Sequence, residues 1–269
     1  MIFPYLSLYI LIFSFICFIL FIIFPCPHGK FSYKLPLPIS PDLAWSMINL
    51  PALICIFGYW DIDNNRWITD VPNTKGWICL TFFIVHFVWR GLISVLWINM
   101  IHSDENYRGS KKTSFLIVLA SWLYYPFVGM LIRYMCNNIK DEINVNDMLF
   151  LIGCIVFLCL NAYVDISLNF KRKTSRYTHT NSNGTYLTKQ GMQEYFRILF
   201  DLGVESPNYL FEIIEWGFFA ALAFRFEALW WLIATILILL PRALWTSHWM
   251  STDTIDFCPK KIKKTRITF

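Results

Sequence analysis

Residues that could bind a ligand or take part in catalysis occur inside stretches that are otherwise strongly apolar. In three of these stretches the polar residues repeat at helical spacing: His86 with Arg90, Asn161 with Asp165, and Asn208 with Glu212 and Glu215. Spacings of this kind place the members of each set on one face of an α-helix. Because an ionisable side chain inside a membrane-spanning helix is costly unless it is paired or lines a cavity, each set is a candidate functional site.

The chemistry of these groups favours an anionic ligand rich in hydrogen-bonding groups, such as a dinucleotide. Arg242 lies in the last apolar stretch, and Arg172 and Lys173 follow the stretch that carries Asp165. Arginine pairs with phosphate, amides donate and accept hydrogen bonds, and carboxylates accept them. The sequence contains no glycine-rich dinucleotide fingerprint and no P-loop, so a nucleotide site would have to lie between helices. The alternative, in which the charged residues form ion pairs that only fix helix contacts, remains open.

The elements that must position these residues are membrane-spanning helices. The 269 residues are 57% hydrophobic and only 15% charged, and the mean hydropathy is +0.49. A helix needs about 20 apolar residues to cross a bilayer. We therefore predict an all-α, polytopic membrane protein, a single membrane domain over 1–269 built as a seven-helix bundle. The predicted spans are residues 6–25, 43–60, 77–99, 113–136, 147–169, 207–224 and 227–249.

The distribution of basic residues predicts the orientation of these spans. With seven spans, 16 lysines and arginines of the connections and the C-terminal tail fall on one face of the membrane and 4 on the other. By the positive-inside rule the richer face is cytoplasmic, which places the N-terminus outside and the C-terminus in the cytoplasm. The polar residues of the spans then lie in the cytoplasmic half of the bundle. A transporter or channel would need polar groups that reach both faces.

Metal and nucleic-acid binding are not expected. The eight cysteines lie mostly inside spans, form no CxxC pair and have no histidine at metal-ligand spacing. The lysines of the C-terminal tail are interpreted as a solvated anchor at the lipid surface rather than a nucleic-acid site. We predict a membrane-embedded protein that binds neither a metal nor nucleic acid.

The segment from Ser206 to Trp216, which reads SPNYLFEIIEW, resembles the C-terminal signature of the steroid 5-alpha-reductase family, the 3-oxo-5-alpha-steroid 4-dehydrogenases. The family has Asn-Tyr/Phe-x-x-Glu-Ile-x-Glu-Trp at this place, within a C-terminal region that corresponds here to residues 113–269. Further matches extend along most of the chain: His28-Gly29-Lys30, Leu43-Ala44-Trp45, Leu50-Pro51, His86, Arg90, Asn161, Asp165 and Arg242-Ala243.

The resemblance implies an enzyme of steroid or lipid metabolism in the endoplasmic reticulum that uses NADPH to reduce the carbon–carbon double bond of a conjugated enone in a lipid or steroid. In that family hydride goes to the beta carbon, donors polarise the carbonyl, and a proton reaches the alpha carbon. The cofactor-binding residues that the resemblance implies are Asn161, Asp165, Arg172, Asn208, Glu212 and Arg242. The implied substrate-binding residues are Trp45, Phe87, Arg90 and Trp216.

Two departures from the family pattern fall on the groups that hold the substrate carbonyl. Where family members carry a glutamate and a tyrosine, this chain has Asn49 and Phe87. An asparagine amide still donates hydrogen bonds, so Asn49 is the predicted catalytic group, but phenylalanine donates none. Losing a donor to developing negative charge typically costs about 10²- to 10³-fold in rate.

Two other functions compete with reduction. The first is a catalytically silent relative that binds a nucleotide or a lipid, which the residues at positions 49 and 87 favour. The second is a membrane methyltransferase of the isoprenylcysteine type, whose C-terminal helices look similar. That enzyme would need a Glu-Glu pair after the arginine of the last span, and none follows Arg242.

Overall fold

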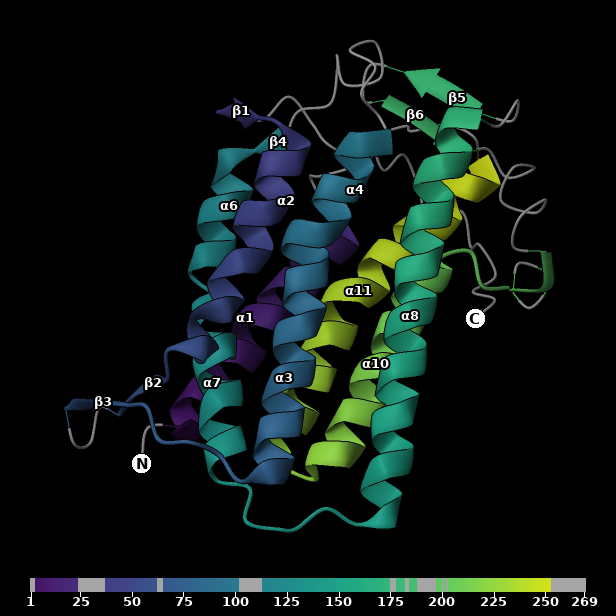
Figure 1. Cartoon of the computed structure of the whole chain (residues 1–269). Helices are drawn as coiled ribbons and strands as arrows, with labels where there is room; N and C mark the ends of the chain where they lie inside the picture. Colours follow the sequence, from purple (N-terminus) through teal and green to yellow (C-terminus); the bar gives the residue numbers. More distant parts are fainter. Residues whose placement is uncertain are drawn as a thin grey trace.

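The computed structural model describes residues 3–23, 37–61, 65–101, 113–174, 178–181, 184–187, 197–199, 201 and 203–252. Most of these residues are helical, and the long helices run side by side along one common direction (Figure 1). The helices are α1 (Phe3–Ile23), α2 (Pro41–Asn49), η2 (Leu50–Ile56), α3 (Thr74–Val88), η3 (Trp89–Ile93), α4 (Ser94–Ile101), α6 (Phe115–Trp122), α7 (Tyr125–Asn137), α8 (Val145–Thr174), α10 (Pro207–Ala223) and α11 (Phe226–Thr252).

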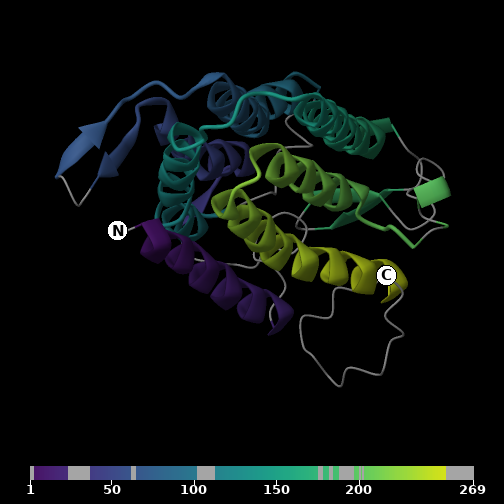
Figure 2. The same cartoon turned by 90° about the horizontal axis from the view of Figure 1, so that it is seen from below.

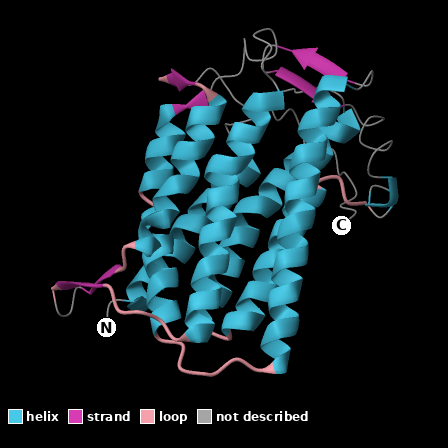
Figure 3. Cartoon of the chain, in the orientation of Figure 1, coloured by secondary structure: helices cyan, strands magenta, loops and turns pink. Residues whose placement is uncertain are grey.

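Short antiparallel strand pairs, which were not predicted, lie at the ends of the bundle (Figure 3). The strands are β1 (Pro38–Ile39), β2 (Tyr59–Asp61), β3 (Arg66–Ile68), β4 (Thr113–Ser114), β5 (Thr178–Asn181) and β6 (Gly184–Leu187). Strand β1 pairs with β4, β2 with β3, and β5 with β6. None of the pairs enters the body of the bundle, so the predicted helical membrane architecture stands.

Five helical segments of the described chain are long and apolar enough to cross a membrane, which supports the predicted multi-pass character. They are Tyr5–Ile23, Thr74–Trp97, Phe115–Asn137, Val145–Leu168 and Phe226–His248. The second predicted span is a shorter apolar helix, Leu43–Ile56. The sixth is α10, whose 17 residues end where Phe224 adopts the left-handed conformation at φ 49°. Helix length alone therefore accounts for five of the seven predicted spans.

Three of the apolar helical segments are interrupted. Helix α2 continues into the 3₁₀ helix η2, which has Pro51 in its first turn. Helix α3 continues through the π-helix η3 into α4. The segment formed by α6 and α7 breaks at Leu123 and Tyr124, and Pro126 follows in the first turn of α7. A π-turn inside an α-helix redirects its side chains and is frequent at functional sites.

Helix α10 lies inside the bundle, packed between α8 and α11 (Figure 2). Its residues Trp216 and Phe219 are fully buried beside Phe83 and Leu80 of α3, and they form the centre of the aromatic core. Helix α1 covers α11 on the other side. The outward side of α1 is apolar and exposed, with Phe15 and Ile16 about half exposed, as expected for a surface that faces lipid.

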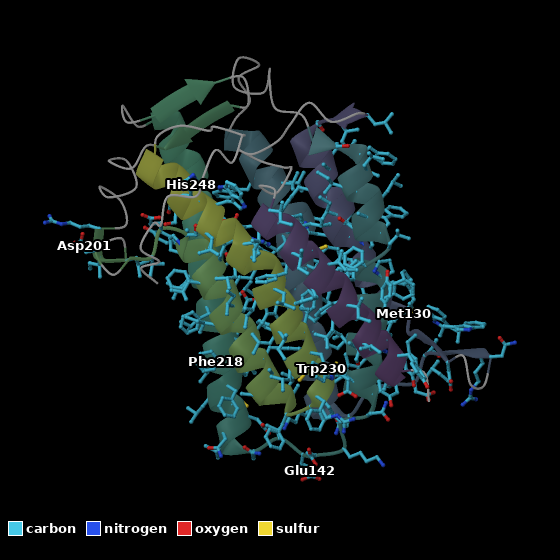
Figure 4. The ribbon with its side chains drawn as sticks, turned by 180° about the vertical axis from the view of Figure 1, so that it is seen from behind. Met130, Glu142, Asp201, Phe218, Trp230 and His248 are labelled. Carbon is cyan, nitrogen blue, oxygen red and sulfur yellow. The ribbon has the colours of Figure 1, made fainter. Side chains whose placement is uncertain are left out.

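The two ends of the bundle carry different connections (Figure 1). The N-terminus, the β2–β3 pair and the connections from α7 to α8 and from α10 to α11 lie at one end. Strands β1, β4, β5 and β6 lie at the other. Figure 4 shows the same separation, with Glu142 at the first end and His248 towards the second. The candidate residues Arg90, Asp165 and Arg242 occupy the half of their helices nearer the second end.

Candidate active site

Arg90 joins three parts of the chain. It lies in the π-helix η3 and is only 6% exposed. Its Nη1 donates to Oδ2 of Asp165 on α8 at 3.0 Å, and its Nη2 donates to Oε2 of Glu212 on α10 at 2.9 Å. Removing one partner of such a buried pair leaves an uncompensated charge. The predicted sets on three separate helices therefore meet at one point.

His86 lies one turn before Arg90 and reaches the same helix, α10. Its Nδ1 is 2.5 Å from Oε1 of Glu215, and its Nε2 is 4.0 Å from Oε1 of Glu212. Both His86 and Glu215 are buried, at 2% and 0% exposed. A contact this short between a ring nitrogen and a carboxyl oxygen requires one shared proton.

These five residues, His86, Arg90, Asp165, Glu212 and Glu215, are called the ionic cluster below. The cluster holds three carboxyl groups against one guanidinium, so its acidic groups outnumber its permanent cation. Oε2 of Glu215 is buried and has no hydrogen-bond partner among the described residues. Buried charge that is not neutralised is expensive. The cluster is therefore suited to accept hydrogen bonds or positive charge from outside.

Polar groups extend from the ionic cluster towards the start of α10. Nδ2 of Asn208 donates to Oδ1 of Asp165 at 3.3 Å. The next residue, Tyr209, packs its ring against Arg242 of α11, with 5.1 Å between the guanidinium carbon and the ring centroid. Arg242 follows Pro241, which lies inside α11. An amide, a carboxylate and an arginine are thus lined up along one end of α10.

Asn161 is buried in the body of α8, one turn before Asp165, and is 1% exposed. Its Oδ1 has no hydrogen-bond partner among the described residues. A buried amide oxygen without a donor is costly. The Oδ1 atom of Asn161 and the Oε2 atom of Glu215 are thus two buried acceptors without a donor among the described residues.

Three aromatic side chains, Trp45, Phe87 and Trp216, border the ionic cluster and are called the aromatic group below. The Trp45 ring lies 5.3 Å from the guanidinium carbon of Arg90, and the Trp216 ring lies 4.6 Å from the His86 ring. Phe87 packs against Trp216 at 6.4 Å between ring centroids and is 2% exposed. The predicted substrate-binding residues therefore lie beside the predicted cofactor-binding ones.

Asn49 stands at the end of α2, where that helix approaches η3. A Cβ atom added at Gly91 would lie 3.1 Å from the Asn49 Cβ atom, so the two backbones are in close contact there. The Asn49 side chain is buried, and its Nδ2 donates to the Trp45 carbonyl oxygen at 2.7 Å. That bond uses one of the two N–H donors of the amide and leaves the other for a ligand.

The structure thus places the predicted residues Arg90, Asp165 and Glu212 in the ionic cluster. Near it lie five more of the predicted residues: Trp45, Asn49, Phe87, Asn208 and Trp216. Arg172 belongs to the last turn of α8, and its side chain lies outside the described residues. Two tyrosines beside the site were given no role from the sequence: Tyr209, which belongs to the signature segment, and Tyr125, which was not identified. Tyr209 touches Arg242, and Tyr125 packs against Phe87 at 5.6 Å. Two adjacent hydroxyl groups in the middle of the predicted fourth span, at Tyr124 and Tyr125, were the available signal.

The other buried ion pair that the described residues contain is remote from this site. Nζ of Lys75, in the first turn of α3, donates to Oδ1 of Asp147, in the first turn of α8, at 2.9 Å. No group of three or more histidine, cysteine, aspartate or glutamate side chains suited to a metal ion occurs in the described part of the chain.

Comparisons with known proteins point to one family. Residues 111–264 match the sequence model of the family described as 3-oxo-5-alpha-steroid 4-dehydrogenase. A protein named steroid 5-alpha-reductase DET2 from Solanum lycopersicum is 24% identical over 269 residues, which cover 97% of this chain and 94% of the relative. The Rattus norvegicus protein named 3-oxo-5-alpha-steroid 4-dehydrogenase 1 is 25% identical over 245 residues, covering 88% and 83%.

A protein of the latter name from Bos taurus is 23% identical over 266 residues, which cover 94% of this chain and 91% of the relative. The matches therefore run along nearly the whole chain at low identity. The family model alone spans more than half of the chain, and it includes α8, α10 and α11 with their part of the ionic cluster. The chain belongs to the 3-oxo-5-alpha-steroid 4-dehydrogenase family, an oxidoreductase family, as a divergent member.

Proposed function

We propose that this chain is an NADPH-dependent reductase of a carbon–carbon double bond conjugated to a carbonyl group in a membrane lipid, with a 3-oxo-delta-4 steroid as the type of substrate. The observation that carries the proposal is the bridge from Arg90 to Asp165 and Glu212, with Asn208 on the same aspartate. The family signature supplies two of these residues, Asn208 and Glu212. The full-length relatives named as steroid reductases support the same reaction.

The residues along α8, α10 and α11 fit NADPH. Arg242, and Arg172 at the end of α8, suit its phosphate groups. Asp165 suits ribose hydroxyls, Asn208 suits the carboxamide, and Glu212 orders Arg90 beside them. The unpaired Oδ1 of Asn161 needs a donor such as an amide N–H or a hydroxyl. When bound, NADPH supplies the hydride that reduces the substrate.

The aromatic group suits the flat apolar body of a steroid or a similar lipid. Trp45, Phe87 and Trp216 offer ring surfaces beside the ionic cluster, and Arg90 lies under the Trp45 ring. The free N–H of Asn49 donates to the substrate carbonyl oxygen. Electron density moves to that oxygen as hydride reaches the beta carbon, so a donor there stabilises the transition state. A proton then reaches the alpha carbon.

The proposal includes an arrangement of the chain in the membrane. All seven apolar segments cross the bilayer, and Leu43–Ile56 and α10 are the two short ones. The end with β5 and β6 is cytoplasmic because the sequence assigns 16 of the 20 lysines and arginines outside the spans to the connections and the tail of that face, and the N-terminus is luminal. The endoplasmic reticulum is the proposed location. NADPH would reach the site from the cytoplasm.

In a second candidate function, the chain is a catalytically silent relative that binds a nucleotide or a lipid and reduces no substrate. The observation that favours it is the engagement of Asn49 with its own helix, combined with the phenyl ring at position 87. The variant with both Asn49→Glu and Phe87→Tyr discriminates the two. Steroid reduction that appears in the variant and is absent in the wild type supports the silent relative, whereas turnover by the wild type excludes it.

The experiment that tests the main proposal is NADPH binding by the purified protein in nanodiscs, followed by nicotinamide fluorescence. Arg242→Ala is expected to weaken binding at least about tenfold, because a charge-assisted bond to phosphate is lost. Arg225→Ala is the matched control, since Arg225 precedes α11 at the opposite end and pairs with Glu227 at 3.4 Å. Equal affinity in the wild type and Arg242→Ala, or no binding by either, would contradict the cofactor assignment.

A further inference from the structure

Where the family has a tyrosine, Phe87 offers no hydrogen-bond donor to the substrate carbonyl. Tyr125 lies next to the Phe87 ring. The Tyr125 and Phe87 rings meet edge to face, with centroids 5.6 Å apart and planes at 72°. We propose that the Tyr125 hydroxyl donates the second hydrogen bond to the carbonyl oxygen of the lipid enone. This inference rests on the proposed reductase function and adds a catalytic residue from α7 to it.

The break between α6 and α7 directs two successive tyrosines to different neighbours. Tyr124 turns to α1, where its ring stacks on Phe13 at 4.9 Å and its hydroxyl is 2.9 Å from Oγ of Ser14. Tyr125 turns to Phe87 of α3 instead. The irregular turn at Leu123 and Tyr124 separates α6 from α7, so Tyr125 is the first residue of α7, and Pro126 follows it.

The two hydroxyl groups also differ in whether they are satisfied. Tyr124 is 2% exposed and its hydroxyl is paired. Tyr125 is half-buried, and its hydroxyl has no hydrogen-bond partner among the described residues. A tyrosine hydroxyl that forms no hydrogen bond within the described residues can donate one to a ligand. A ligand carbonyl would supply the acceptor that the chain does not.

Charged groups of both signs act on the Tyr125 hydroxyl. Burial and the Glu212 carboxylate disfavour negative charge at this hydroxyl, whereas Arg90 and Arg242 favour it. Arg90 is also bonded to Glu212 at 2.9 Å, which offsets part of the effect of that carboxylate. The two guanidinium groups would favour an enone oxygen that gains negative charge next to this hydroxyl.

The reaction is balanced with Tyr125 acting only as a donor. Hydride arriving at the beta carbon breaks the carbon–carbon π bond, and the electron pair moves to the carbonyl oxygen to give an enolate. The O–H of Tyr125 donates to that oxygen and keeps its proton. A proton from solvent then adds to the alpha carbon and the carbonyl re-forms, so the enone is reduced by two electrons while NADPH is oxidised to NADP⁺.

The test compares Tyr125→Phe with Tyr124→Phe in nanodiscs, using NADPH and a 3-oxo-delta-4 steroid. Each variant loses one hydroxyl, but the Tyr124 hydroxyl bonds to α1, away from Phe87. Tyr125→Phe is expected to lower kcat about 10²- to 10³-fold with little change in KM and in NADPH affinity. It should also reduce the red shift of the enone absorption band on binding, which reports hydrogen bonds to the carbonyl, because only the bond from Asn49 remains. Tyr124→Phe is expected to retain both.

A rescue variant separates catalysis from folding. Phe87→Tyr added to Tyr125→Phe returns a hydroxyl to the neighbouring ring and is expected to recover at least about tenfold in kcat, a fraction of what one donor contributes. Unchanged kcat and red shift in Tyr125→Phe would overturn the role of Tyr125 and leave the reductase function intact. A wild type that binds NADPH but neither shifts nor reduces the steroid would overturn both.

Discussion

Arg90 and Glu212 are 122 positions apart in the sequence, yet the Nη2 and Oε2 atoms of their side chains lie 2.9 Å apart inside the bundle. Asp165 completes the arrangement on the other guanidinium nitrogen at 3.0 Å. One arginine thus ties the π-helix η3 to α8 and α10. The same contacts serve stability and hold two carboxylates in the place where the proposed cofactor binds.

Removing the guanidinium should destabilise the fold. Arg90→Met removes the guanidinium partner of the buried Glu212 carboxylate and of the half-buried Asp165 carboxylate, and breaking a buried pair in this way costs about 3–5 kcal/mol. We expect a clear fall in the Tm of the protein in nanodiscs. Adding Glu212→Gln to the variant should recover part of the loss, because one of the unpaired charges is gone.

The control for that variant is Arg197→Ala. Arg197 forms a pair with Asp201 at 3.8 Å, but both side chains are largely exposed, and Asp201 lies outside the bundle in Figure 4. Exposed pairs contribute little. A Tm that falls equally in Arg90→Met and Arg197→Ala would contradict the structural role of Arg90.

The ion pair between Lys75 and Asp147 should affect stability without affecting the site. Lys75→Met removes the partner of a carboxylate that is buried at the opposite end of the bundle. The expected result is destabilisation of about 3–5 kcal/mol, with NADPH affinity unchanged at temperatures where the variant is folded. Thermal unfolding and fluorescence titration of the same sample measure both. Loss of NADPH affinity in the folded variant would show that the two ends are coupled.

Close packing of η2 against α7 depends on Gly129. A Cβ atom added there would lie 2.2 Å from the backbone oxygen of Ala52, which cannot move without shifting η2. Gly129→Ala is therefore expected to destabilise the protein by about 1–3 kcal/mol. Gly217→Ala is the matched control, because nothing lies within 4 Å of its added Cβ.

Alanine at position 217 should instead stabilise α10 by about 0.5–1 kcal/mol through the loss of chain flexibility in the unfolded state. Both variants are compared by thermal unfolding. Equal Tm values for Gly129→Ala and the wild type would mean that η2 and α7 are less tightly packed than the structure shows.

The residues of the site could be predicted from helical spacing and the cost of buried charge. His86 with Arg90 and Asn208 with Glu212 and Glu215 each lie on one helix face, and a charge in an apolar helix must find a partner. Which partner it finds depends on packing between helices far apart in sequence. The bond of Arg90 to both Asp165 and Glu212 therefore could not be derived from spacing alone.

Local irregularities were the part of the fold that spacing did not predict. The prediction of a second span over 43–60 missed that the helix changes to 3₁₀ geometry at Leu50, ends at Ile56 and is followed by strand β2. The π-helix at Trp89–Ile93 and the break before Tyr125 leave no clear periodic signal in the sequence, because most residues around them are hydrophobic whichever way they face. Tyr125 went unnoticed for that reason.

The central claim is that hydride passes from NADPH to a membrane lipid enone at this site. The most direct measurement is mass spectrometry of the product after the purified protein in nanodiscs is given a 3-oxo-delta-4 steroid and NADPH that carries deuterium in its transferable position. We expect a saturated ketosteroid with one deuterium at the beta carbon. At limiting NADPH, Arg242→Ala should give at most about one tenth of the product that the wild type gives. Unreduced steroid despite bound NADPH, or a product without deuterium, would contradict the central claim.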